Sequence, residues 1–171
     1  MERLIDWMWH LVEVIFLGCI RILEKLIHKD IPEKTRQVLL QFVKFGIVGV
    51  SNSLINYLAY VASLLLFRKL TWFAAGDFLA AQIVAFVLSV LWSYYWNYRY
   101  VFAGETEKSS TWMVTLAKTF VAYSFTGLIL SEALLLLWVN VVGLSEFVAP
   151  VLNILICFPI NFVINKLWTF K

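Results

Sequence analysis

Four cations stand at the edges of long apolar stretches in this chain, and they are the residues best suited to bind an anion. They are Lys44, Arg99, Lys118 and Lys166. An arginine donates to two phosphate oxygens at once, and a lysine supplies a compact point charge. These four positions are therefore candidate phosphate ligands.

Uncharged polar side chains recur inside the same stretches at helical spacing, so that each set falls on one helix face. Such sets can line a partly polar cavity, or they can form hydrogen bonds between helices worth about 0.6 kcal/mol each. The number of amides favours a cavity, while packing stays an alternative for any single residue. The candidates are Asn52, Asn56, Gln82, Ser93, Asn97, Asn153, Asn161 and Asn165.

No constellation for catalysis or metal binding accompanies these residues. The sequence has no glycine-rich phosphate loop with a lysine, no nucleophile elbow and no histidine pair at zinc spacing. His10 and Glu13 share a helix face, where we expect a solvated polar stripe, and Cys19 and Cys157 follow no spacing motif. We therefore expect a protein that is not an enzyme and needs no metal or cofactor, and an ATP-driven pump is excluded for the chain alone.

The composition indicates that lipid is the main solvent of this chain. Of its 171 residues, 62% are hydrophobic, 17% are aromatic and only 15% are charged. An average soluble domain is about 45–50% apolar and about 25% charged, and a globule of this size cannot hide such an excess. The net charge of +3 is weak and scattered, so nucleic acid is not an expected partner.

Four apolar stretches are each long enough to span a bilayer, which takes about 20 helical residues. Only helices satisfy their own backbone hydrogen bonds there without closing a barrel. No stretch shows the alternation typical of a strand. The pattern therefore predicts an all-α membrane domain over residues 32–171. The expected spans are residues 39–67, 73–98, 114–142 and 147–168.

Residues 1–31 precede these spans and have a different pattern. Polar residues trace one narrow helical stripe, and Trp7 and Trp9 suit the level of lipid headgroups. We expect an amphipathic helix at the membrane surface rather than a signal peptide. A fifth span is the alternative, although its acidic residues are costly in hydrocarbon.

The positions of Lys and Arg predict the orientation. Twelve of them fall on the side that holds both termini and the middle connection, and two fall on the other side. The positive-inside rule places the first side in the cytoplasm. The same rule explains cations at helix ends without any ligand. The four candidate phosphate ligands can therefore also be cations that only set the orientation, and this alternative stays open.

Glu132 is a carboxylate inside the third span. At such a depth it costs several kcal/mol unless it is paired or protonated. We expect it to couple to protons or to contact a polar headgroup. A protonated packing residue that faces an amide or a hydroxyl is the alternative.

The chain also repeats itself. Residues 97–102 end the second span and residues 165–170 end the fourth, with the shared pattern of Asn, a cation, an aromatic residue and Phe. The span starts at 42–49 and 120–127 match as well. Each repeat is then a two-helix hairpin, and the two copies are parallel because each contains an even number of spans.

These features resemble the GtrA-like family of small four-span membrane proteins. The resemblance rests on 42–49, on Ser51, Asn52 and Ser53 with Asn56, and on the two endings, and it covers about residues 41–171. It implies a bacterial cytoplasmic-membrane protein that acts in cell-surface polysaccharide or teichoic-acid glycosylation. The implied partners are a polyprenyl-phosphate-linked sugar, which the protein would move across the membrane, and a membrane glycosyltransferase.

The leading hypothesis is therefore a translocase in which the phosphate meets the cations, the sugar follows the amide face and the prenyl tail stays in lipid. One alternative is a non-transporting partner subunit of a glycosyltransferase. Another is a small proton-coupled exporter of hydrophobic cations, which fits less well with a ring of Lys and Arg. A homodimer is plausible, because Gly46 with Gly49 and Gly127 with Ser131 offer close-contact faces, which intrachain packing can equally use.

Overall fold

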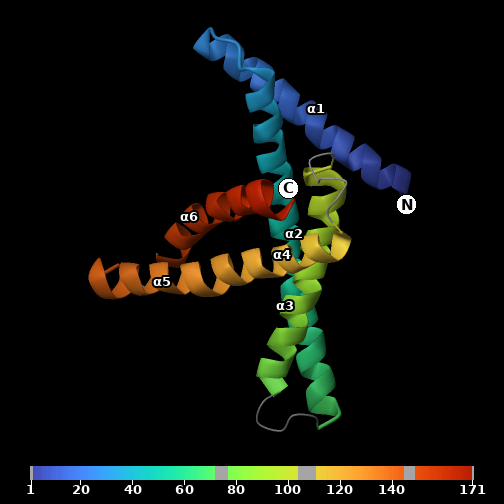
Figure 1. Ribbon diagram of the computed structural model, residues 1–171, viewed down its shortest axis with the longest axis vertical. Coiled ribbons are helices and arrows are strands. Elements are labelled where there is room, and N and C mark those ends of the chain that lie inside the picture. The colour runs from blue at the N-terminus through green and yellow to red at the C-terminus, as the bar shows by residue number, and fades with distance from the viewer. Residues whose placement is uncertain (1, 72–76, 104–110, 145–148, 171) are drawn as a thin grey trace.

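The computed structural model describes residues 2–71, 77–103, 111–144 and 149–170 (Figure 1). Across these ranges the chain forms helices and no strand, which confirms the all-α prediction. The first helix, α1, covers Glu2–Ile27, and the second, α2, covers Glu33–Lys69. Pro32 precedes α2, and its carbonyl accepts the N–H groups of Thr35 and Arg36 at 2.9 and 3.0 Å.

The next helix, α3, covers Asp77–Trp96 and continues as a π-helical turn, η2, over Asn97–Val101. α2 and α3 pack along each other and form the first of two hairpins (Figure 1). At the far end of this hairpin, Arg68 Nε donates to Asp77 Oδ2 at 2.9 Å. The acidic start of α3 thus pairs with the basic last turn of α2, as the two helix dipoles favour.

A second hairpin follows. Its first arm runs without a break through α4 (Trp112–Ser124), η3 (Phe125–Leu130), α5 (Ser131–Leu136) and η4 (Leu137–Val141). Its second arm is α6 (Ala149–Ile164) with η5 (Asn165–Thr169). In Figure 1 the first hairpin follows the long axis, whereas α4, α5 and α6 extend sideways from it. Within the described residues, the long helices therefore pack as two hairpins that meet near the repeated endings, 97–102 and 165–170, and not around one common interior.

Within the described residues, two helical segments are long and apolar enough to cross a membrane. They are Glu33–Lys69 in α2 and Leu152–Thr169 in α6 and η5. Helices also cover residues 77–98 and 114–141 of the other two expected spans, and their crossing of the bilayer stays a prediction.

The two repeated endings adopt the same local structure. In each, the N–H of the final Phe donates to the carbonyl of the Asn five residues earlier: Phe102 to Asn97 at 2.8 Å and Phe170 to Asn165 at 3.0 Å. This wider turn buries the Asn and the final Phe together, and all four side chains are fully buried. The chain repeat seen in the sequence is thus a repeat of conformation as well.

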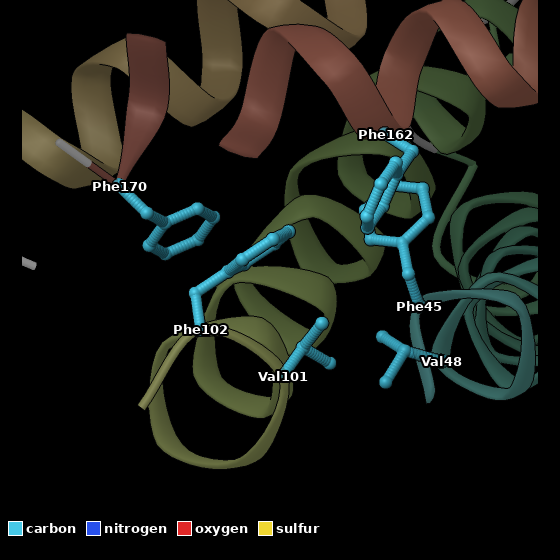
Figure 2. Close-up of a cluster of buried hydrophobic side chains, with 6 residues drawn as sticks. All are labelled: Phe45, Val48, Val101, Phe102, Phe162 and Phe170. Carbon is cyan, nitrogen blue, oxygen red and sulfur yellow. The ribbon is translucent and has the colours of Figure 1, made fainter. Parts of the chain in front are cut away.

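The hydrophobic core lies where these endings meet α2 (Figure 2). Phe102 stacks on Phe170 with ring centroids 4.7 Å apart, and Phe162 lies 5.9 Å from Phe102. Phe45 of α2 packs edge-on against Phe162 at 5.5 Å. A Cβ at Gly46 would meet the Phe158 ring at 3.3 Å, so this glycine serves packing between α2 and α6 within the chain.

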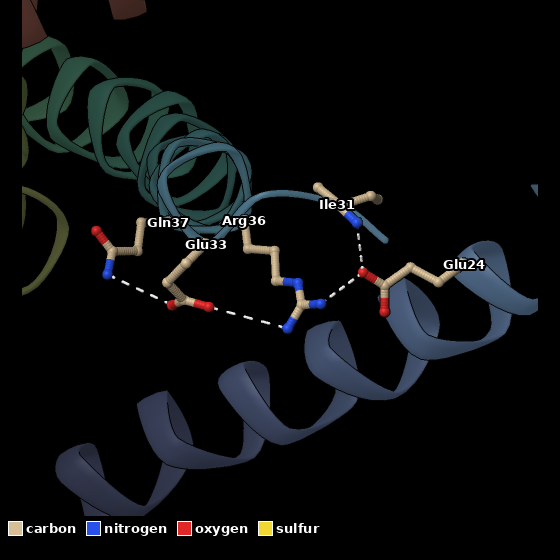
Figure 3. A network of polar contacts seen from close by, with 5 residues as sticks. All are labelled: Glu24, Ile31, Glu33, Arg36 and Gln37. Carbon is tan, nitrogen blue, oxygen red and sulfur yellow. Dashed lines mark hydrogen bonds and ion pairs between the residues drawn. The ribbon is translucent and has the colours of Figure 1, made fainter. Parts of the chain in front are cut away.

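A polar corner joins α1 to α2 (Figure 3). Glu24 Oε1 accepts the N–H of Ile31 at 2.8 Å and the Arg36 guanidinium at 2.6 Å. These two contacts, the Ile31 N–H first, hold the pKa of Glu24 below its ordinary value of 4.5. On the other side of Arg36, the Glu33 carboxylate lies 3.8 Å away.

The stacked pair predicts that the two endings contribute equally to stability. Phe102→Ala and Phe170→Ala should each lower the free energy of unfolding by about 3–5 kcal/mol, because each leaves a cavity in the core. Leu167→Ala, at a position 56% exposed on the second ending, is the control and should cost far less. Denaturant unfolding in detergent micelles measures the three values, and an equal loss in all of them would contradict the prediction.

The corner predicts a dependence of stability on pH. A carboxylate whose pKa is lowered by folding stabilises the fold above its unfolded pKa, and this contribution is lost as the pH falls through the folded value. The wild type should therefore melt above Glu24→Gln at neutral pH, and the gap should close as the pH falls from about 6 to about 3. A gap in melting temperature that is constant with pH would show that Glu24 acts through packing alone.

Candidate functional site

A groove with both apolar and polar walls opens between the two arms of the second hairpin. It has a volume of about 410 Å³, within the range of about 300–1,000 Å³ typical of small-molecule sites. Its apolar wall comes from Gly127, Leu135, Ile154, Cys157 and Phe158. Its polar groups are those of Tyr123, Thr126, Ser131, Asn153 and Asn161.

Two predicted cavity residues, Asn153 and Asn161, are thus in the groove. Asn153 Nδ2 donates to the Ser131 carbonyl at 2.7 Å and lies 3.2 Å from the Ser131 hydroxyl. Asn161 Oδ1 accepts from Thr126 Oγ1 at 3.3 Å and from Asn165 Nδ2 at 3.0 Å. The groove walls are therefore fixed by bonds between α6 and the facing arm.

Tyr123 connects this groove to the first hairpin. Its hydroxyl lies 2.5 Å from Ser93 Oγ and accepts Asn97 Nδ2 at 3.4 Å, and it also bonds the Asn161 side chain. Asn97 donates to Ser93 as well, at 3.1 Å. One hydroxyl thus holds polar groups of α3, η2 and α6 together where the two hairpins meet.

The remaining cavity candidates lie elsewhere. Asn56 donates to Ser89 at 3.2 Å inside the first hairpin. Asn52 is half-buried, with an amide oxygen that has no hydrogen-bond partner within the described residues, and Gln82 is exposed. Glu132 belongs to α5, and its side chain lies outside the part of the chain that is described.

A second cavity, of about 370 Å³, lies beside the start of α2 and contains Lys44. Gln37, Leu40 and Gln41 of α2 line it together with Tyr100, Val101 and Ala103. We call it the basic site. Lys44 is only 9% exposed, so its ammonium requires a partner, because an unpaired buried charge is very costly.

The other three predicted phosphate ligands differ in their position relative to this basic site. Lys166 donates to Gln41, which lines it. Arg99 is exposed and donates to the Tyr100 hydroxyl at 3.3 Å. Lys118 is half-buried on α4 and does not line the basic site. Three of the four cations thus belong to or adjoin one cavity.

Sequence reasoning missed Tyr123 and Gln41, which line these sites, and Glu13, which pairs with Lys44 of the basic site. Glu13 was expected in a solvated stripe, but its carboxylate lies 2.5 Å from Lys44 Nζ. The sequence did contain a sign that Tyr123 is important. When the two span starts are matched, Tyr123 takes the place of Phe45 and so adds a hydroxyl at a core position. No spacing rule pointed to Gln41.

The segment 44–170 matches the family described as GtrA/DPMS, transmembrane domain. No curated protein and no solved structure matches the chain. The matched segment covers most of the chain, which belongs to this family and is a membrane protein associated with polyprenyl-phosphate-sugar processes. This bears out the resemblance to GtrA-like proteins, and α1 lies outside the matched residues.

The Tyr123 hydroxyl predicts a measurable coupling between the hairpins. Tyr123→Phe should lower the free energy of unfolding by about 1–3 kcal/mol, because it leaves buried partners unpaired. Tyr57→Phe makes the same change on a side chain that is 64% exposed and should have little effect. In a double-mutant cycle, Ser93→Ala should cost less when Tyr123→Phe is already present; additive losses would contradict a shared bond.

Proposed function

We propose that this protein is a translocase that moves a polyprenyl-phosphate-linked sugar across a bacterial cytoplasmic membrane for cell-surface glycosylation. The observation that carries the proposal is the polar groove at Tyr123, Asn153 and Asn161 inside otherwise apolar helices. A sugar that crosses hydrocarbon without partners leaves several hydroxyls unpaired, at several kcal/mol each. Amide and hydroxyl groups along a helix pair replace the lost water.

The basic site supports the same proposal at the phosphate end of the substrate. Lys44 supplies a buried charge there, and Lys166 reaches it through Gln41. Asn161 of the groove precedes Lys166 by five residues, which is ~7.5 Å along a helix axis. A sugar-phosphate headgroup that spans this distance can therefore contact the groove while its phosphate lies near the lysines.

The assignment of roles follows from this layout. Lys44, Lys166 and Arg99 interact with phosphate oxygens, the groove amides hold the sugar, and the prenyl chain stays in lipid. Glu132 couples transport to protons or contacts the headgroup. Both termini lie in the cytoplasm, where the basic site meets newly made substrate.

Reconstitution tests the proposal. Liposomes that contain the protein, with its partner transferase also supplied, should accelerate the flipping of a labelled polyprenyl-phosphate sugar. Lys44→Gln and Asn161→Leu should each slow flipping by about tenfold or more, the equivalent of one lost hydrogen bond to a charged or buried group. The control Tyr57→Phe should flip at the wild-type rate.

Two outcomes would contradict the translocase. One is no acceleration over protein-free liposomes. The other is acceleration that is equal for farnesol and for the phosphorylated sugar lipid, since that would indicate a general disturbance of the bilayer.

A second function, a non-transporting partner of a glycosyltransferase, is favoured by the surface of α1. This helix lies outside the family-matched residues and exposes Leu4, Trp7 and Leu26 at 61%, 59% and 72%. Capture of a glycosyltransferase through α1, with full glycosylation in Glu132→Gln and Lys44→Ala, would favour this role over transport.

A further inference from the structure

The N-terminal half of α1 contacts two residues that line the basic site, Lys44 and Tyr100. Glu13 Oε1 lies 2.5 Å from Lys44 Nζ, and the same ammonium lies 5.8 Å from the centre of the Trp9 ring. Trp9 stacks on Tyr100 with ring centroids 5.4 Å apart. Asp6 accepts a hydrogen bond from the Tyr100 hydroxyl at 3.3 Å. Three residues of one helix face thus contact Lys44 and Tyr100, which both line the basic site.

The Glu13 carboxylate has the chemistry of the ligand that the basic site is proposed to bind. Like a phosphate oxygen, it is an anionic acceptor that forms a charge-assisted bond with a lysine. The two partners differ in burial, because the Lys44 side chain is 11% exposed and that of Glu13 is 38% exposed. Glu13 can therefore turn into water on release, whereas Lys44 stays buried and needs another anion at once.

We propose that Glu13 occupies the phosphate position of the basic site and that residues 6–13 of α1 act as a latch, which a phosphorylated lipid displaces. This inference rests on the proposed function, since it assigns the basic site to phosphate. The ligand is a phosphate ester of a long-chain alcohol, and it exchanges with Glu13 at Lys44. Neutral lipids cannot make this exchange, because they would leave Lys44 unpaired.

The polar corner supplies the fixed end of the latch. Glu24 holds the N–H of Ile31 and Arg36 where α1 joins α2 (Figure 3), so the C-terminal end of α1 stays attached when its N-terminal half moves. The latch also lies outside the family-matched segment, which begins at Lys44. It is therefore a regulatory addition to the basic site and not a part of the matched domain.

Binding of farnesyl phosphate to the full chain in nanodiscs tests the latch, with farnesol as the uncharged ligand. Glu13→Gln should bind farnesyl phosphate about fivefold tighter or more than the wild type, because the competing carboxylate is gone. Asp30→Asn removes the same charge from an exposed position between α1 and α2 and should leave the affinity unchanged. Neither variant should bind farnesol more tightly.

Hydrogen exchange gives a second readout that does not depend on a variant. Farnesyl phosphate should raise the exchange of the wild-type amides of residues 6–13, and farnesol should not. Equal or weaker binding by Glu13→Gln, or unchanged exchange in that segment, would overturn the latch.

The latch and the proposed function fail in different ways. If Lys44→Gln slows flipping while Glu13→Gln changes neither affinity nor exchange, the latch is wrong and the translocase stands. If neither the wild type nor Glu13→Gln prefers farnesyl phosphate to farnesol, the basic site takes no phosphate, and both the assignment of Lys44 and the latch fall.

Discussion

The stacking of Phe102 on Phe170 is the contact on which the rest of this helical arrangement depends. Each ring closes a π-helical turn that buries an Asn, and the two turns end different hairpins. The stack therefore joins the hairpins, and the same turn presents Asn97 to Tyr123. The polar junction and the aromatic core thus both depend on the wider turn that the repeated ending adopts.

Much of this was predictable because it follows from local pattern. Lengths of apolar sequence set the helices, and like endings gave like turns, since an Asn and a Phe five residues apart make the same bond in both copies. The direction of the second hairpin was not predictable, because it depends on how two aromatic ends pack. A polar stripe likewise determines which face of a helix is polar, but not which neighbouring helix that face meets. Asn56, for example, forms its hydrogen bond with Ser89 inside the first hairpin, whereas the stripe had suggested an interior shared by both hairpins.

The same limit explains the missed members of the two sites. Tyr123 reads as one more aromatic residue in an apolar helix, and only its alignment with Phe45 shows that a hydroxyl has been added to a core position. Glu13 reads as one acid of a solvated stripe. Its meaning appears only when α1 folds back along α2 and brings that stripe to Lys44, a long-range contact that no spacing in α1 encodes.

The strong donors of both sites already have partners within the chain. Lys44 has Glu13, Lys166 has Gln41, and the Asn153 amide has Ser131. A ligand would therefore enter by exchange, and its affinity would be the difference between its own bonds and those it replaces. An anion gains most where the displaced group returns to water at little cost, which describes Glu13 better than any buried amide. Exchange of this kind favours release as well as entry, because the chain's own groups return to the vacated donors, and the proposed translocase would need both steps.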